Sequence, residues 1–232
     1  MSHPSFIIAT TKSWNISLAN EMKLSSNYGQ IHVITQKEQL NIDLLNEVQP
    51  NYVFFPHWSW IIPDEIINNF RCVIFHMTDL PFGRGGSPLQ NLIERGIEET
   101  KICAVKATGE IDAGDVYLRH PLSLHGTAEE IFKRAANIIF YEMIPYILNE
   151  NPIPVPQEGT VTLFKRRTPD MSELTPDMSL EKCYDYIRML DAEDYPKAFL
   201  RYGNFNLQFS RPKLTSNGIV ADVLIKEVEA DE

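Results

Sequence analysis

The sequence predicts an α/β fold with a Rossmann-like open, mostly parallel sheet, helices on both faces, and a small C-terminal α+β appendage. Short runs of β-branched and aromatic residues recur early in the chain with little polar alternation, as in strands covered on both faces. Segments of helical character separate these runs, and such alternation is typical of a parallel sheet with right-handed crossovers. At 232 residues, the chain is long enough for one such domain and an appendage.

The elements of the main domain follow from these patterns in order. Strands are expected over residues 5–10, 30–35, 52–55 and 72–75, with helices over residues 14–27, 37–48 and 64–70 between them. A helix over residues 87–96 and strands over residues 101–107 and 116–118 follow. The clearest helix covers residues 127–149, because Thr127 begins a capping box and apolar residues then recur at helical spacing.

Three prolines at positions 152, 154 and 156 interrupt regular structure, so we expect a first domain over residues 1–156 and a small module over residues 157–232. The module is predicted to contain a strand over residues 161–164, a helix over 179–190, and strands over 199–202, 206–210 and 219–228. Its apolar residues can form a satellite core or the face of a homodimer, and the sequence leaves this open; they include Phe199, Phe205, Leu207 and Phe209.

Composition limits the possible partners and the compartment. The chain carries 21 Lys and Arg against 31 Asp and Glu, a formal charge of −10, which repels phosphate backbones, so no nucleic-acid partner is expected. Cys72, Cys103 and Cys183 are odd in number and far apart, which favours reduced thiols over a disulfide or a metal site. No apolar run approaches about 18 residues, so we expect a soluble cytoplasmic protein without a membrane partner.

Candidate site residues gather where the strands end. Ligands of open α/β sheets bind at the carboxyl ends of the strands, which is where His57 and His76 fall. The turn after the first strand lacks a Gly-x-Gly-x-x-Gly fingerprint, so dinucleotide binding is not predicted. Three glycines at 83, 85 and 86 permit close backbone approach, and Arg84 among them can receive an anion or be a solvated side chain of a structural turn.

A histidine and a carboxylate on two loops are candidates for proton transfer. His76 ends a predicted strand and has the side chain best suited to exchange protons near neutral pH, with a reference pKa of about 6.5, although a lone His on an apolar run is more often a core residue. Asp112 lies in a tight polar loop between two predicted strands, where it can orient His76 or relay its proton.

These segments resemble the folate-dependent formyltransferases, a family that includes sugar N-formyltransferases. The resemblance rests on His-Met-Thr-Asp-Leu-Pro at 76–81, Gly-Arg-Gly-Gly-Ser-Pro-Leu-Gln at 83–90 and Ile-Asp-Ala-Gly-Asp at 111–115. Upstream, Trp-Ser-Trp-Ile-Ile-Pro at 58–63 is similar to the family loop whose backbone borders the pterin. Downstream, residues 165–170 and 187–199 resemble the short C-terminal module of sugar N-formyltransferases.

The resemblance implies transfer of a formyl group from N10-formyltetrahydrofolate to an amine. The acceptor that it favours is a UDP- or dTDP-linked 4-amino-4,6-dideoxyhexose, of the kind used in surface polysaccharide and pseudaminic acid synthesis. Catalysis is assigned to His76, Asp112 and Thr78. Folate binding is assigned to Trp58, Ser59, Trp60, Ile61, Ile62, Thr108 and Glu110. Binding of the nucleotide sugar is assigned to Arg84, Gly85, Lys165, Arg166 and Arg167, and no metal is implied.

One departure and two alternatives accompany this interpretation. The family usually has Asn two residues before the His, where this chain has Ile74; Thr78, His57 and Asn15 are the candidate replacements. Initiator tRNA is disfavoured as the acceptor because the chain is short and acidic and lacks a full basic C-terminal domain. Formylation of an aminoacyl group on a peptide-synthetase carrier protein, or an inactive folate-binding protein, are the alternatives.

Overall fold

The computed structural model describes residues 4–25 and 28–227, which form two compact units. The first unit comprises Met1–Gly85, Thr100–Leu122 and Lys133–Leu163, and the second comprises Gly86–Glu99, Ser123–Phe132 and Phe164–Glu232. The expected division between residues 156 and 157 stays a prediction. Within the described ranges, no helix combines the length and the apolar character that a membrane crossing requires.

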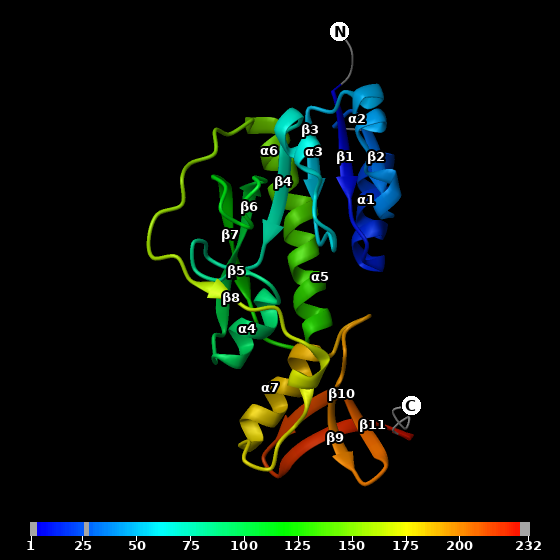
Figure 1. The fold of residues 1–232 in the computed structure, drawn as a ribbon, viewed down its shortest axis with the longest axis vertical. Helices are drawn as coiled ribbons and strands as arrows, with labels where there is room; N and C mark the ends of the chain where they lie inside the picture. Colours follow the sequence, from blue (N-terminus) through cyan, green and yellow to red (C-terminus); the bar gives the residue numbers. More distant parts are fainter. Residues whose placement is uncertain (1–3, 26–27, 228–232) are drawn as a thin grey trace. The chain divides into compact units, whose positions relative to one another are not determined.

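A six-stranded sheet forms the centre of the first unit, in the order β2-β1-β3-β4-β6-β7 (Figure 1). Its strands are β1 (Ser5–Ala9), β2 (Gln30–Ile34), β3 (Tyr52–Phe55), β4 (Cys72–His76), β6 (Glu99–Lys106) and β7 (Val116–Ser123). The pairings β1–β2, β1–β3 and β3–β4 are parallel, whereas β4–β6 is antiparallel. The predicted Rossmann-like, mostly parallel sheet is therefore confirmed.

Both faces of this sheet are buried, as the unbroken apolar runs predict. Ile7, Val53 and Phe55 share one core cluster with Leu45 and Ile66 from two of the helices. Because strand side chains alternate between faces, Phe6 and Phe54 belong to the opposite face, where both are fully buried and their rings meet edge to face at 6.4 Å between centroids.

The helices of the chain depart from the predicted ones at two places. Up to residue 150 they are α1 (Ser13–Ser25), η1 (Lys37–Gln39), α2 (Ile42–Val48), α3 (Asp64–Asn69), α4 (Pro88–Glu94), α5 (Ala128–Ile138), η2 (Ile139–Met143) and α6 (Ile144–Glu150). The predicted helix 37–48 is broken because the Asn41 side chain accepts the Leu44 N–H at 2.9 Å and starts a new helix. The predicted helix 127–149 contains a π-helical turn just before Pro145, which has no N–H for the regular bond. Residues 26–27 of the first predicted helix lie outside the described residues.

The second unit contains the predicted helix and the last three predicted strands of the appendage, whereas only Leu163–Phe164 of the predicted strand over residues 161–164 is a strand. These elements are η3 (Pro169–Ser172), α7 (Leu180–Leu190), β9 (Ala198–Tyr202), β10 (Phe205–Thr215) and β11 (Gly218–Glu227), and the strands form an antiparallel sheet in the order β11-β10-β9. Two short strands, β5 (Arg84–Gly85) and β8 (Leu163–Phe164), pair with each other. Phe199 is buried whereas Phe205 is exposed. Val228, the last residue of the predicted final strand, lies outside the described residues.

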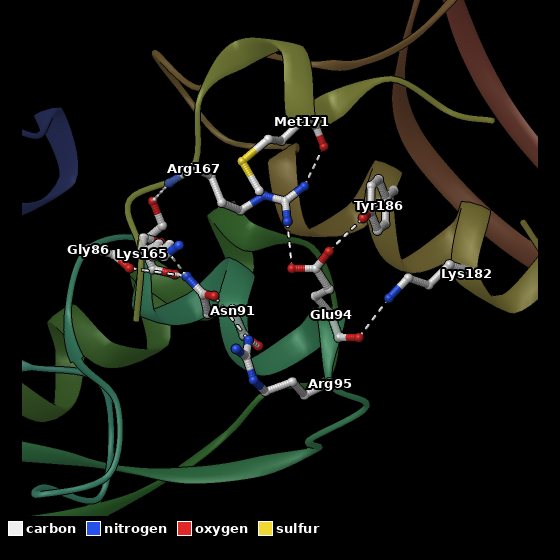
Figure 2. A network of polar contacts seen from close by, with 10 residues as sticks. Gly86, Asn91, Glu94, Arg95, Lys165, Arg167, Met171, Lys182 and Tyr186 are labelled. Carbon is white, nitrogen blue, oxygen red and sulfur yellow. Dashed lines mark hydrogen bonds and ion pairs between the residues drawn. The ribbon is translucent and has the colours of Figure 1, made fainter. Parts of the chain in front are cut away.

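A network of polar contacts around Glu94 joins segments of the second unit (Figure 2). The Glu94 carboxylate accepts from Nη1 of Arg167 and from the Tyr186 hydroxyl, both at 2.6 Å, and its main-chain oxygen accepts from Nζ of Lys182 at 2.7 Å. Burial opposes ionisation of Glu94, but the hydrogen bonds from Tyr186 and Arg167 and the nearby cations lower its pKa below the usual value. Ionised Glu94 is therefore a structural anchor of this unit.

Glu94→Gln is expected to lower the free energy of unfolding by about 1–2 kcal/mol at pH 7, because an amide cannot replace a carboxylate that accepts from a cation. The folded pKa of Glu94 is lowered, so its contribution is present above the unfolded pKa and is lost as the pH falls through the folded value. Thermal unfolding from pH 7 down to pH 3 measures this. The matched control is Glu65→Gln on exposed α3 surface; an equal effect of both changes would contradict the prediction.

Candidate active site

The carboxyl ends of β3 and β4 lie side by side and carry the two predicted histidines. Phe55 pairs with Ile74 in the parallel register, so the chain leaves both strands at the same edge and reaches His57 and His76 there. His57 has a positive φ of 55°. Burial, with a smaller contribution from the Lys12 charge, lowers the pKa of His57 to about 4, so its imidazole is neutral at pH 7.

His76 is held at both ring nitrogens. Its side chain is almost fully buried, with Nε2 at 2.8 Å from the main-chain oxygen of Gly83 and Nδ1 at 3.4 Å from Oδ2 of Asp112. Because a carbonyl oxygen only accepts, Nε2 carries a hydrogen. The contact between Nδ1 and the carboxyl group is then attractive only when a proton lies on one of them. The two predicted residues thus lie close enough for the carboxylate to form an ion pair with a protonated imidazole.

Asp112 is presented by a strained, close-packed loop between β6 and β7. Its φ is 53°, a left-handed conformation that is uncommon for residues other than glycine. Its Oδ2 also accepts the N–H of Gly85 at 2.9 Å, so the glycine turn and the Asp112 loop are joined. Gly114 allows this close approach, because any Cβ there would clash with the main-chain oxygen of Lys106.

Of the candidate replacements for the family Asn, Thr78 lies with His76. Its buried hydroxyl is 3.4 Å from the same Gly83 oxygen that accepts from His76. Asn15 instead donates to the main-chain oxygen of Pro56 at 3.2 Å, next to His57. Ile74 packs against two apolar core clusters, so an amide at that position would be buried among hydrocarbon side chains.

Arg84 contacts Glu110 and also Gln157, a residue that was not predicted from the sequence. The Arg84 guanidinium lies 3.4 Å from Oε1 of Glu110 and donates from Nε and Nη2 to Oε1 of Gln157, at 3.1 and 2.9 Å. Gln157 also donates to main-chain oxygens of the Asp112 loop. Gln157 directly follows the proline-rich break and belongs to no recognisable motif, so the sequence did not identify it.

The loop predicted to bind folate exposes only part of its side chains. Trp58 packs on the core, and Ile62 is buried in it. Ile61 is 88% exposed and Trp60 39%, so these two present apolar surface to solvent. Ser59 lies 3.4 Å from the Thr11 hydroxyl. In the neighbouring β6–β7 connection, the Thr108 hydroxyl donates to the main-chain oxygen of Glu110 at 2.9 Å. Thr108 and Glu110 are both exposed.

The three consecutive basic residues of the second unit divide into two kinds. Lys165 and Arg166 are exposed. Arg167 is not, because its guanidinium donates to Glu94 and to the main-chain oxygen of Met171, as Figure 2 shows, and also lies over the ring of Tyr186. The geometry therefore gives Arg167 an internal structural contact, and its predicted contact with substrate has no support from this arrangement.

The cysteines and acidic residues show no metal-binding arrangement in the part of the chain that the structure describes. Cys72 and Cys103 are buried thiols, Cys183 is half-buried, and all three are free. Burial raises the pKa of the Cys72 thiol to about 12. No group of three His, Cys, Asp or Glu side chains in those residues is arranged to hold a metal ion.

Comparisons with known proteins identify similar chains. The model of the family described as formyl transferase matches residues 9–138, and that of the methionyl-tRNA formyltransferase C-terminal domain matches residues 169–226. A solved structure, "Methionyl-tRNA formyltransferase from Clostridium thermocellum", is 56% identical with a TM-score of 0.95 and covers 97% of this chain and 99% of that one.

Two further relatives are more distant. Methionyl-tRNA formyltransferase of Rickettsia massiliae is 27% identical over 183 residues; the match covers 75% of this chain and 60% of that protein's length. HypX from Aquifex aeolicus, solved in complex with tetrahydrofolic acid, has a TM-score of 0.76 at 14% identity and covers 98% of this chain and 46% of that one. The HypX likeness shows the fold alone.

These matches contradict the expected acceptor. A nucleotide-linked amino sugar, with its link to pseudaminic acid and surface polysaccharide, was favoured over tRNA because the chain is short and acidic, and no nucleic-acid partner was expected. Both expectations are wrong, because the 56% identical structure and the curated relative are named methionyl-tRNA formyltransferases, and residues 169–226 match the C-terminal domain of that enzyme. Net charge and length were not adequate guides to the acceptor.

Gly114→Ala is expected to destabilise the protein by about 3 kcal/mol, because the new methyl group must displace the main chain of β6. Gly109→Ala is the matched control in the same connection, since a Cβ at Gly109 meets no atom within 4 Å and is expected to change stability by less than about 0.5 kcal/mol. Thermal or urea unfolding measures both. Equal stability of the two variants would show that the close approach at Gly114 is not required.

Proposed function

Since the chain belongs to the formyl transferase family, we propose that it transfers the formyl group of N10-formyltetrahydrofolate to the amino group of methionyl-tRNA. Membership confirms the expected family of folate-dependent formyltransferases and the co-substrate of that family. The acceptor is part of the proposal. The observation that carries it is the match at 56% identity over nearly the full length of both chains. A cytoplasmic location, expected from the free thiols, belongs to the same proposal.

His76 and Thr78 are proposed to bind the formyl oxygen. In the structure, Nε2 of His76 and the Thr78 hydroxyl converge on the carbonyl oxygen of Gly83, at 2.8 and 3.4 Å. Two donors aimed at one oxygen in a buried site are the arrangement that stabilises a developing oxyanion. Ile74 supplies no donor, and Thr78 fills that role.

The His76–Asp112 pair is proposed to move the proton of the reaction. The neutral amine of the acceptor attacks the formyl carbon, a carbon–nitrogen bond forms, and the bond from that carbon to N10 of the folate breaks. The amine loses one proton and N10 gains one, so the pair needs only to accept a proton and return one. A proton shared between Nδ1 and Oδ2 at 3.4 Å is suited to this exchange.

Folate and tRNA are proposed to bind through separate groups of residues. The exposed Trp60 and Ile61, with the main chain of Ser59, are suited to a flat apolar ring such as the pterin. Exposed cations of the second unit are suited to phosphates of the acceptor end: Lys165, Arg166, Lys213 and Lys226. Local cations can therefore contact RNA although the whole chain carries a charge of −10.

The test is the release of tetrahydrofolate from N10-formyltetrahydrofolate with four acceptors: methionyl-tRNA, uncharged tRNA, free methionine and a nucleotide-linked amino sugar. The proposal predicts release, and formation of formylmethionyl-tRNA, with methionyl-tRNA alone. No release with methionyl-tRNA, or equal release with the amino sugar, would overturn it.

His76→Ala is expected to reduce the rate of formyl transfer by about 10²–10⁴-fold because the proton carrier is lost. Thr78→Val, which keeps the shape and removes the hydroxyl, is expected to reduce it by about 10²-fold, whereas Thr78→Ser keeps the donor and serves as the matched control. Turnover is measured beside circular dichroism, which should show folded protein in each case. Normal turnover of folded Thr78→Val would exclude Thr78 from the oxyanion site.

A further inference from the structure

Gln157 connects two segments of the candidate site through one side-chain amide. Its Nε2 donates to the main-chain oxygens of Asp112 and Gly114 at 2.7 and 2.8 Å. Its Oε1 accepts from Nε and Nη2 of Arg84 at 3.1 and 2.9 Å. Both hydrogens of the amide and both acceptor positions of its oxygen are thus used, which fixes the orientation of the group.

The contact to the Asp112 loop matters because that loop is strained. Asp112 adopts a φ of 53°, and a residue other than glycine keeps such a conformation only when its surroundings enforce it. The two hydrogen bonds from Gln157 fix the main chain at Asp112 and at Gly114. The Asp112 carboxylate can then contact Nδ1 of His76 and the N–H of Gly85 at the same time. The hydrogen bonds of Gln157 go to Arg84 and to the main-chain oxygens of Asp112 and Gly114, so its effect on His76 passes through Asp112.

The contact to Arg84 ties the glycine turn to the same amide. Arg84 follows Gly83, whose carbonyl oxygen accepts from His76. Its side chain is only 12% exposed, and it is directed to Gln157 and to Oε1 of Glu110. A shift of the Gln157 amide would therefore move both the Asp112 carboxylate and the Gly83–Arg84 turn, which contact the two ring nitrogens of His76.

We propose that Gln157 is a positioning residue for formyl transfer, which holds the Asp112 carboxylate and the Gly83–Arg84 turn in register with His76. This inference rests on the proposed function for its kinetic consequence. Its structural consequence, the dependence of the His76–Asp112 contact on Gln157, is independent of which acceptor the enzyme uses.

Gln157→Glu separates the two halves of the contact. A glutamate keeps an oxygen for the Arg84 guanidinium and adds a charge that favours it, but it has no hydrogen to donate to the carbonyl oxygens of Asp112 and Gly114. The variant is thus expected to release the Asp112 loop while it retains Arg84. Gln157→Ala releases both. The matched control is Gln49→Glu. Gln49 is exposed, and its side chain donates to the main-chain oxygen of Asn46 at 2.8 Å, so this change also removes one hydrogen bond to a main-chain oxygen.

Two measurements on the full chain test the inference. The first is kcat and KM for N10-formyltetrahydrofolate and methionyl-tRNA, with the dependence of kcat on pH. Gln157→Glu is expected to lower kcat by about 10²-fold, the cost typical of a misplaced reacting group, with little change in either KM and an altered pH profile. The second is the ¹⁵N chemical shift of Nδ1 of His76, which is expected to move in Gln157→Glu and Gln157→Ala and to stay unchanged in Gln49→Glu.

The outcomes separate this inference from the proposed function. A lower melting temperature of Gln157→Glu with wild-type kcat and an unchanged His76 signal would show a merely structural role and overturn the inference. If the wild type does not formylate methionyl-tRNA, the proposed function fails, yet a shifted His76 signal in Gln157→Glu still supports the positioning role. An unchanged signal in folded Gln157→Glu contradicts that role whatever the acceptor is.

Discussion

The contact between Nδ1 of His76 and Oδ2 of Asp112 is the interaction on which the geometry of the candidate site depends. The parallel sheet brings His76 to the end of β4, and the β6–β7 connection returns Asp112 to the same edge. A glycine at position 114 lets this connection approach β6, and the N–H of Gly85 fixes the carboxylate from the other side. Together these features hold the Asp112 carboxylate beside the His76 ring, whose other nitrogen and the Thr78 hydroxyl both face the Gly83 carbonyl oxygen.

Much of the fold was predictable from sequence because its signals are local in the chain. Strands buried on both faces leave unbroken apolar runs, and residues 52–55 were predicted with the bounds observed for β3. The break at Asn41 and the π-helical turn before Pro145 were missed. The Asn41 side chain caps a new helix, and Pro145 lacks an N–H. Each feature changes single hydrogen bonds within a sequence pattern that is otherwise helical.

The site was only partly predictable. His76, Asp112 and Thr78 follow from motif and spacing, and the structure brings them together; their roles stay proposals. Gln157 was missed because all its partners except Arg84 are main-chain oxygens, which no side-chain pattern encodes. Arg167 was predicted to contact the substrate; its guanidinium pairs with Glu94 in the structure, and the predicted role stays a prediction. Net charge also did not predict the similarity to methionyl-tRNA formyltransferases, because contact of a protein with RNA depends on where its cations lie and not on their sum.

The most direct measurement of the central claim is the single-turnover rate of formyl transfer to methionyl-tRNA in Asp112→Asn, with folate binding measured in parallel. The amide retains the size of the side chain but cannot share the proton with His76. The account predicts that N10-formyltetrahydrofolate binds as in the wild type while the transfer rate falls by about 10²-fold or more. Transfer at the wild-type rate by folded, folate-bound Asp112→Asn would contradict it.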